Sequence, residues 1–248
     1  MWILATYNLK GGVGKTTASV NLSFTAARNS RQVLVWDLDP QGAATYYFRI
    51  KPKIKGGAGK ILRKKNKLED SIKATNYPRL ELVPADFSNR NLDLLLSEMK
   101  HSKYRLEKVL ATVQDDYDYI FLDCAPSISV TSENIFTVAR VLLIPLIPTY
   151  LSIRAYIQLK SYMARHDEYK VLLMPFFSMV DKRKQLHREI LQNFYKQHPE
   201  VLRISIPYSS EVEQMGHYCA PVQTFAGKSI AAKSFDLLWY EIQRRLKV

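Results

Sequence analysis

Apolar residues occur along the chain in short continuous runs, separated by longer segments in which apolar and polar residues are mixed. Continuous runs are typical of parallel strands that are covered on both faces. They predict strands over residues 2–8, 32–37, 80–84, 118–123, 140–146, 170–178 and 202–206. The mixed segments predict helices over residues 15–29, 89–98, 103–114, 131–139, 151–166, 182–197 and 228–247. We therefore expect a doubly wound α/β fold with a mostly parallel sheet, helices on both faces and ligands beyond the carboxyl ends of the strands.

A glycine-rich stretch joins the first predicted strand to the first predicted helix, and it reads Lys10-Gly11-Gly12-Val13-Gly14-Lys15-Thr16-Thr17. Strand, glycine loop and helix are the context of a phosphate-binding loop, in which backbone N–H groups and the helix N-terminus face a polyphosphate. Lys15 would neutralise the β- and γ-phosphates, and the hydroxyl of Thr16 would reach Mg²⁺. The loop departs from the common pattern, because Leu9 replaces its first glycine and Lys10 adds a second lysine.

Acidic residues stand at the carboxyl ends of two further predicted strands. The second strand runs into Asp37-Leu38-Asp39-Pro40-Gln41-Gly42, and the strand over 118–123 ends at Asp123. A carboxylate that ends an apolar strand in this way is typical of a Walker B residue, which would hold Mg²⁺ through water. Asp37 and Asp39 are two residues apart, so both can point to the same side. An alternative for Asp37 is that it caps the turn that follows.

These three motifs, in this order, resemble those of the ParA/MinD family of deviant Walker-A P-loop ATPases, and the likeness continues over nearly the whole chain. It is closest to the ParA (Soj-like) partition ATPases that lack an N-terminal DNA-reading domain. We therefore expect residues 1–248 to form a single P-loop ATPase domain with ATP and Mg²⁺ as cofactors. The resemblance implies that Asp39 orients the attacking water, that Asp37 supports the metal together with Thr16 and Asp123, and that Lys15 binds phosphate.

The resemblance also implies a role for Lys10 that a solvated loop lysine would not have. In the family this lysine crosses a dimer interface and touches the phosphates that the other subunit binds. We therefore expect an ATP-dependent sandwich dimer, with slow, partner-stimulated hydrolysis of ATP that releases it. A ParB-like protein or another cargo adaptor would stimulate the reaction. Segments 39–45 and 123–130 are candidate switch loops.

The formal net charge is +13 and the isoelectric point is near 9.6, which favours binding to a polyanion. Basic residues gather in segment 51–67, at 182–188 and in the last predicted helix. The family binds DNA without sequence preference through basic residues of its later helices. The DNA contacts that we predict on this basis are Lys182, Arg183, Lys184, Arg188, Arg244 and Arg245. Glu211 stands where the family often has an arginine, so we expect no DNA contact there.

A second functional class is a MinD-like regulator that cycles on a membrane. Its support is an apolar stripe on the last predicted helix: Phe235, Leu238, Trp239, Ile242 and Leu246. We expect this stripe to pack on the sheet instead. No apolar stretch reaches the roughly 20 residues of a membrane span, and a membrane partner is not expected. An iron–sulfur reductase is disfavoured because its cluster cysteines are absent.

Three further features change the interpretation little. Cys124 and Cys219 form no C-x-x-C pair, which favours a reducing cytoplasm, and Cys124 is expected to be buried. The resemblance to the ParA proteins implies association with the nucleoid. The five histidines show no metal-ligand spacing. Residues Gly56–Lys60 resemble a phosphate loop but lack its Ser/Thr, so we expect a flexible basic loop there.

Overall fold

The computed structural model describes all 248 residues and contains one seven-stranded sheet. The strand order is β3-β4-β2-β5-β1-β6-β7, and every pairing is parallel except that of β3 with β4. The strands are β1 (Trp2–Thr6), β2 (Val33–Asp37), β3 (Lys73–Ala74), β4 (Leu80–Val83), β5 (Tyr119–Asp123), β6 (Val141–Leu146) and β7 (Leu172–Phe177). The expected α/β fold with a mostly parallel sheet is confirmed.

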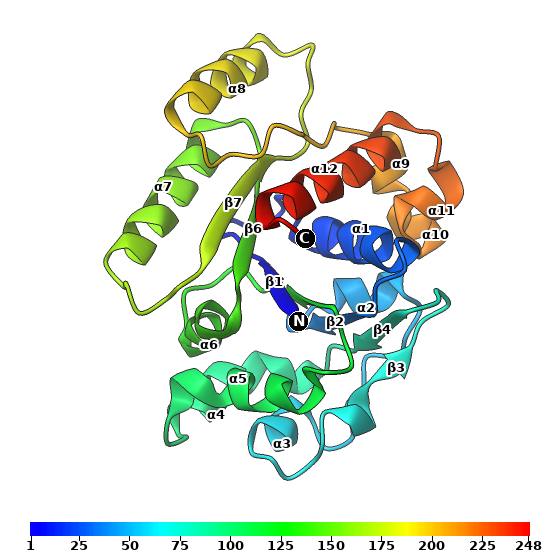
Figure 1. Cartoon of the computed structure of the whole chain (residues 1–248), viewed down its shortest axis with the longest axis vertical. Helices are drawn as coiled ribbons and strands as arrows, with labels where there is room; N and C mark the ends of the chain where they lie inside the picture. Colours follow the sequence, from blue (N-terminus) through cyan, green and yellow to red (C-terminus); the bar gives the residue numbers. More distant parts are fainter.

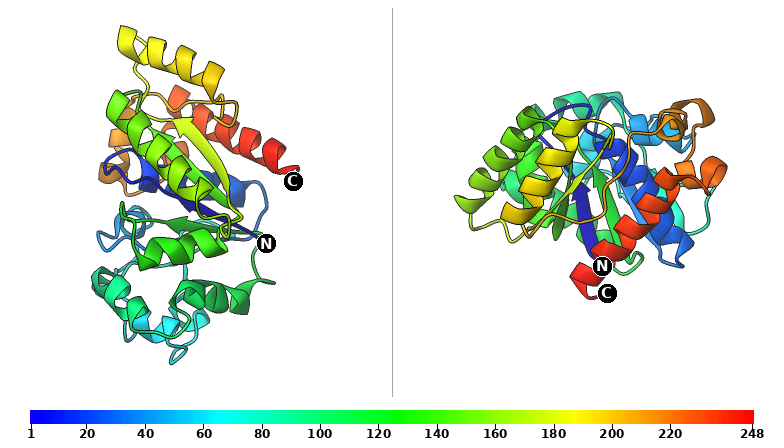
Figure 2. Two further views of the ribbon diagram at one scale, coloured as in Figure 1. Left: turned by 90° about the vertical axis from the view of Figure 1, so that its left-hand side faces the viewer. Right: turned by 90° about the horizontal axis from the view of Figure 1, so that it is seen from above.

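Helices cover both faces of the sheet (Figure 1). The longer ones are α1 (Lys15–Arg28), α6 (Val130–Val138), α7 (Tyr150–Ala164), α8 (Gln185–Gln197) and α12 (Ile230–Leu246). The shorter ones are α2 (Ala43–Tyr47), α3 (Ala58–Leu62), α4 (Leu92–Ser97), α5 (Arg105–Leu110), α9 (Ser210–Glu213), α10 (Met215–Tyr218) and α11 (Val222–Ala226). Figure 2 shows the same layers from two further sides.

The core consists of two apolar clusters, one on each face of the sheet. One cluster of 28 buried residues joins the sheet to α1 and α12, and the other, of 37, joins it to α3–α8. Adjacent residues of β1 belong to different clusters, because Leu4 faces α1 and α12 whereas Ile3 and Ala5 face the other helices. Both faces of β1 are therefore dry, which explains why its apolar run is continuous.

The predicted strand over 202–206 is wrong. The segment is extended beside β7, with Leu202 N–H donating to Pro175 O and Ile206 N–H to Phe177 O, both at 2.8 Å. The N–H groups of Arg203 and Ile204 donate instead to the carboxylate of Glu241 on α12, at 2.9 Å each. A buried side chain thus accepts the hydrogen bonds that a ladder would make. Strand β3 was not predicted, because its two residues are exposed and carry no apolar signal.

The helices predicted over 89–98 and 103–114 are interrupted. Residues Phe87–Asn91 form a 3₁₀ turn before α4, and further 3₁₀ turns flank α5. The side chain of Asn134 on α6 accepts from the N–H groups of both Arg105 and Leu106, at 3.0 and 3.1 Å. A distant side chain therefore caps α5, and local sequence does not report where such a helix begins.

The expectation of a flexible basic loop over Gly56–Lys60 is also wrong, since α3 begins at Ala58. Ala58, Ile61 and Leu62 are buried in the larger cluster. The expected packing of the last helix is confirmed: the side chains of its apolar stripe are all at most 9% exposed, and Trp239 packs edge-on against Tyr119 of β5. Cys124 is buried, as expected. None of the helices has the length and apolarity that crossing a membrane demands.

Candidate nucleotide-binding site

The glycine loop lies between the carboxyl end of β1 and the start of α1, near the middle of the sheet. Gly12 and Gly14 have positive φ angles of 69° and 94°, which favour glycine. A Cβ on Gly14 would also lie 3.0 Å from the hydroxyl of Ser178, just after β7. No side chain caps the N-terminus of α1. Its first N–H groups are therefore free to bind an anion.

The two lysines of the loop lie close to one another. The amine of Lys15 donates to the carbonyl of Lys10 at 3.3 Å, and Lys15 is only 7% exposed. Burial lowers the pKa of Lys15, and the carboxylate of Asp123 opposes this shift. Asn8 holds the start of the loop, since its side chain accepts from Lys10 N–H at 2.9 Å and donates to Pro145 O at 2.8 Å. The Lys10 side chain itself is half-buried.

Three polar residues end three neighbouring strands beside this loop. Thr6, Asp123 and Asp37 end β1, β5 and β2, and the strand register places Asp123 next to both of the others. The hydroxyl of Thr6 lies 2.6 Å from that of Ser19 on α1 and donates to Asp123 Oδ1 at 3.2 Å. Both carboxylates are fully buried. The structure thus brings together acids that are 86 positions apart in the sequence.

The two buried carboxyl groups lie close together and away from water, and a bound cation would compensate their negative charge. Burial raises the pKa of Asp37, and burial together with the charge of Asp37 raises the pKa of Asp123. Asp37 Oδ1 and Asp123 Oδ2 are buried without a hydrogen-bond partner. Oxygen ligands of this kind suit Mg²⁺. The chain has no cluster of three or more His, Cys, Asp or Glu residues that could hold a metal ion.

Asp37 also has the structural role that the alternative interpretation proposed. Its Oδ2 accepts from both the N–H and the hydroxyl of Thr45 on α2, at 2.8 and 2.7 Å. The same Thr45 hydroxyl accepts from Ala85 N–H at 2.7 Å, and the Asn89 side chain donates to Asp37 O at 3.2 Å. Asp37 therefore uses one oxygen for structure and keeps the other free. Thr45 lies in the predicted switch segment 39–45, but its contact with Asp37 was not predicted, and neither was the role of Asn89, which belongs to no recognisable motif.

Asp39 lies outside this buried network, half-buried in a tight turn. Its Oδ1 accepts from Gln41 N–H at 2.9 Å, and its carbonyl accepts from Gly42 N–H at 2.9 Å. Gly42 has a φ of 65°, and a Cβ there would lie 3.3 Å from Ala85. The turn holds Asp39 in place at the start of a predicted switch loop. Its role in orienting water stays a prediction.

Some of the predicted DNA contacts are exposed and form no side-chain hydrogen bond or ion pair, whereas others already bond to groups of the protein itself. Lys182, Lys184 and Arg244 are exposed. Arg183 is exposed but forms an ion pair with Asp181 at 2.9 Å, and Arg188 donates to the carbonyls of residues 182 and 183. Arg245 donates to the carbonyls of residues 200 and 201, which ties α12 to the segment after α8. Its guanidinium is therefore less available to a phosphate than the others.

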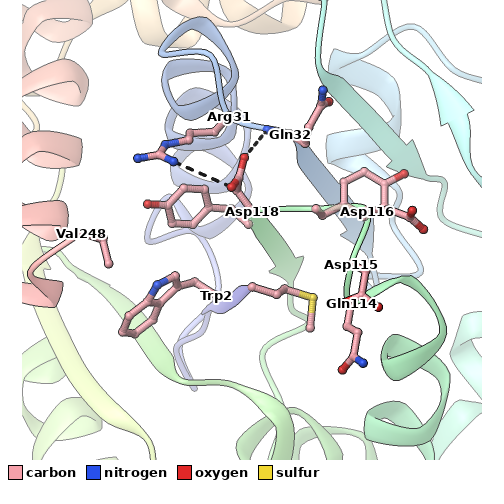
Figure 3. Close-up of a pocket in the computed structure, with 11 residues that line it drawn as sticks. Trp2, Arg31, Gln32, Gln114, Asp115, Asp116, Asp118 and Val248 are labelled. Atoms are coloured by element: carbon pink, nitrogen blue, oxygen red, sulfur yellow. Dashed lines mark hydrogen bonds and ion pairs between the residues drawn. The ribbon is translucent and has the colours of Figure 1, made fainter.

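A cavity of about 590 Å³ lies at the opposite, amino-terminal edge of the sheet (Figure 3). Asp115, Asp116 and Asp118 line it, and Asp118 accepts from Gln32 N–H at 2.9 Å and pairs with Arg31 at 3.8 Å. Three carboxylates would repel the phosphates of a nucleotide. This cavity therefore does not suit a nucleotide.

Comparisons with known proteins agree with this geometry. A family model described as an AAA domain matches residues 1–172. The sporulation initiation inhibitor protein Soj of Bacillus subtilis is 29% identical over 239 residues, which is 94% of this chain and 94% of that protein.

Solved structures are similar over the full length of the chain. A plasmid partition protein of Borrelia burgdorferi B31, solved with AMPPNP, has a TM-score of 0.85 at 20% identity and covers 98% of this chain and 99% of its own. A cobyrinic acid a,c-diamide synthase of Mycobacterium smegmatis, solved with ADP and magnesium, has a TM-score of 0.85 at 24% identity. The match covers 100% of this chain and 96% of that chain. At these identities the structural likeness establishes the fold.

Proposed function

Because the chain belongs to the ParA/MinD family of P-loop ATPases, we propose that it is a ParA-type ATPase that positions or segregates a cargo. ATP assembles a sandwich dimer, the dimer binds DNA without sequence preference, and hydrolysis releases it. The cargo is a plasmid, a chromosome or a large protein assembly. The observation that carries the proposal is the buried pair Asp37 and Asp123, each with an unpartnered oxygen, beside a loop that has a lysine on either side of its glycines.

In this proposal the chain binds ATP through charge and backbone donors. The free N–H groups at the start of α1 and the amine of Lys15 bind the phosphates, and the lysine leaves the Lys10 carbonyl to do so. Thr16, Asp37 and Asp123 would hold Mg²⁺, which supplies positive charge against the phosphate oxygens. Asp39 orients the attacking water. The Mycobacterium smegmatis relative, solved with ADP and magnesium, supports this pairing of nucleotide and metal.

Lys10 makes the proposed ATP-dependent dimer testable. A lysine delivered across a dimer interface acts as an arginine finger does, and such groups contribute roughly 10³–10⁵ in rate. Nucleotide then becomes part of the interface, so that binding assembles the dimer and hydrolysis dissolves it. The protein would act as a timer, with an adaptor, ParB-like or otherwise, setting the rate.

DNA binding rests on charge. The exposed cations at the start of α8 and on α12 are available to phosphate oxygens, and such contacts are independent of sequence. Association with the nucleoid follows from this property. The MinD-like alternative has less support, because the apolar stripe of α12 that would face a membrane is buried against the sheet.

The test compares the wild type with Lys10→Ala. We expect light scattering to detect a dimer with ATP and not with ADP, and we expect Lys10→Ala to lose this dimer or the hydrolysis that follows it, by at least about 10³-fold in rate. Two further assays distinguish the DNA-binding proposal from the MinD-like alternative. Retention on random duplex DNA supports the first, and pelleting with anionic liposomes supports the second. The proposal would be contradicted by an oligomer that forms equally with ATP, with ADP and without nucleotide. It would also be contradicted by a Lys10→Ala protein with unchanged dimerisation and turnover.

A further inference from the structure

The hydroxyl of Thr45 on α2 has one proton, and its neighbours determine where that proton goes. Thr45 is fully buried. Its hydroxyl oxygen accepts a hydrogen bond from Ala85 N–H at 2.7 Å, just after β4, and lies 2.7 Å from Asp37 Oδ2. An N–H group can only donate, so the hydroxyl is the acceptor toward Ala85 and directs its own proton to Asp37. Thr45 is therefore a donor of fixed direction to this carboxylate.

The two oxygens of Asp37 differ in the donors that they receive. Thr45 donates to Oδ2 twice, through its N–H at 2.8 Å and its hydroxyl at 2.7 Å, whereas Oδ1 has no hydrogen-bond partner. Two donors from one residue fix the position of Oδ2. Because a carboxylate is planar, they also restrict the direction in which the free oxygen points.

Asp123 on the neighbouring strand has the same division of donors. The strand register pairs Asp123 with Asp37. The hydroxyl of Thr6 donates to Asp123 Oδ1 at 3.2 Å, and Oδ2 is buried without a partner. The Thr6 hydroxyl also lies 2.6 Å from that of Ser19, and either of these two can be the donor. Of the two threonines, Thr45 is therefore the one whose donor direction the structure fixes.

The position of Thr45 does not depend on Asp37 alone. Its neighbour Ala44 is buried in the core cluster under α1 and α12, and the hydroxyl of Tyr46 donates to Gly216 O at 3.0 Å. Both contacts hold α2 in place without involving the carboxylate. Thr45 can therefore orient Asp37, rather than only follow it.

We propose that Thr45 is a positioning residue, whose hydroxyl orients Asp37 so that the free oxygen of this carboxylate is ready to bind Mg²⁺. This role rests on the proposed ATPase function and acts through Asp37. Groups that hydrogen-bond a metal-binding carboxylate orient it, and their loss typically reduces metal affinity by about 10–100-fold. Without the hydroxyl, Asp37 keeps only the N–H bond and samples more orientations, of which Mg²⁺ must select one.

The test compares Thr45→Val with Thr25→Val, because valine keeps the shape of threonine and removes its hydroxyl. Thr25 on α1 is 1% exposed, and its hydroxyl also contacts a carboxylate and an N–H donor, at 3.1 Å from Asp236 Oδ1 and 3.0 Å from Gln223 Nε2. The two substitutions therefore remove the same kind of hydrogen bonds. We expect comparable decreases in melting temperature, which thermal unfolding measures.

Binding of a fluorescent ATP analogue separates positioning from a purely structural role. It is measured in EDTA and over a series of Mg²⁺ concentrations. We expect Thr45→Val to bind the analogue as the wild type does in EDTA and to need at least about tenfold more Mg²⁺ for the half-maximal effect of the metal. Thr25→Val should need as much Mg²⁺ as the wild type.

Conservative variants complete the series. Thr45→Ser keeps the hydroxyl and should need as much Mg²⁺ as the wild type, whereas Thr45→Cys, whose thiol is a weaker donor, should need more. The proposal is overturned if Thr45→Val has the wild-type requirement, if Thr25→Val raises it equally, or if Thr45→Ser fails to restore it. If Thr45→Val does not fold, equal requirements of the Ser and Cys variants overturn it. A wild type that binds no nucleotide would overturn the proposed function as well.

Discussion

Each of the two buried aspartates has one oxygen in a hydrogen bond and one without a partner. Two like charges on neighbouring strands repel one another, and both acids are removed from water. The resting site therefore stores an unfavourable interaction that a bound cation relieves. The sequence placed both acids at strand ends correctly, because a continuous apolar run followed by aspartate is a local signal. The bond from Thr45 to Asp37 was not predictable, since it depends on how α2 folds back.

This repulsion has a consequence for pH. A carboxyl whose pKa is raised on folding makes the folded state bind more protons than the unfolded state, so stability falls as the pH rises. The free energy of unfolding of the protein without nucleotide and Mg²⁺ should therefore decrease from about pH 4, where unfolded carboxyls titrate, up through the raised pKa values of Asp37 and Asp123.

Asp123→Asn should flatten this slope and stabilise the metal-free protein near pH 8 by about 1–2 kcal/mol. It should also abolish Mg²⁺-dependent hydrolysis. Urea unfolding across a pH series measures the stability, and Asp118→Asn at the far edge of the sheet is a control. A variant with the wild-type slope would show that the pair does not titrate in this way.

Asp39 differs from these two acids because it is half-buried and held in a turn. We expect Asp39→Ala to keep ATP binding, to lose at least about 100-fold in hydrolysis and to trap the ATP dimer. Lys15→Ala should instead lose nucleotide binding, because a phosphate counter-charge disappears. Binding of a fluorescent ATP analogue and release of phosphate distinguish the two. Normal turnover in Asp39→Ala would remove it from the mechanism.

At the scale of elements, the buried strands and the long helices were predictable, whereas the exposed strand β3 and the bounds of the short helices were not. A strand that is covered on both faces can be recognised in the sequence by a run of four or five consecutive apolar residues, as in β2 and β5. Segment 202–206 instead alternates apolar and polar residues, and it lies at the edge of the sheet, where Glu241 accepts two of its N–H groups. A local sequence pattern cannot indicate a hydrogen-bond acceptor that lies 37 or 38 positions away in the chain.

Glu241 should therefore be needed for the edge of the sheet. Glu241 is 5% exposed and its carboxylate accepts from the N–H groups of Arg203 and Ile204, so Glu241→Ala leaves two N–H groups without their acceptor. We expect a loss of about 2–4 kcal/mol in the free energy of unfolding. Glu241→Gln keeps one acceptor oxygen and should lose less. Denaturant unfolding of both variants measures the difference, and equal stabilities would contradict this role.

At the scale of the molecule, charge is divided between separate regions. Cations occupy the start of α8, the outer surface of α12 and residues 51–67, whereas three aspartates line the cavity at the amino-terminal edge of the sheet. The net charge of +13 therefore does not point to one surface. The exposed cations are divided between the late helices, on which we propose that DNA binds, and residues 51–67 around α3.

This division predicts how affinity for DNA responds to substitution. Charge reversal at Arg183, Lys184 and Arg188 should weaken retention on every duplex alike, spare the ATP dimer and reduce the salt dependence, which is about 0.9 log units per phosphate contact for each log unit of salt. The same change at Lys64 and Lys65 should be far milder. Retention on random duplex DNA with ATP and with ADP, over a salt series, measures both. Equal retention with the two nucleotides, or preference for one sequence, would contradict the proposed cycle.

Met1 and Val248 both line the cavity at the amino-terminal edge of the sheet, and Figure 1 shows the two ends of the chain near one another. Ends that lie close together are a condition for circular permutation. A short linker could join them, with new ends opened in an exposed turn, and the rearranged chain should still fold. A fluorescent reporter fused at either original end would likewise stand at the edge of the sheet away from the phosphate loop, so its movement in a cell could be followed without covering that loop.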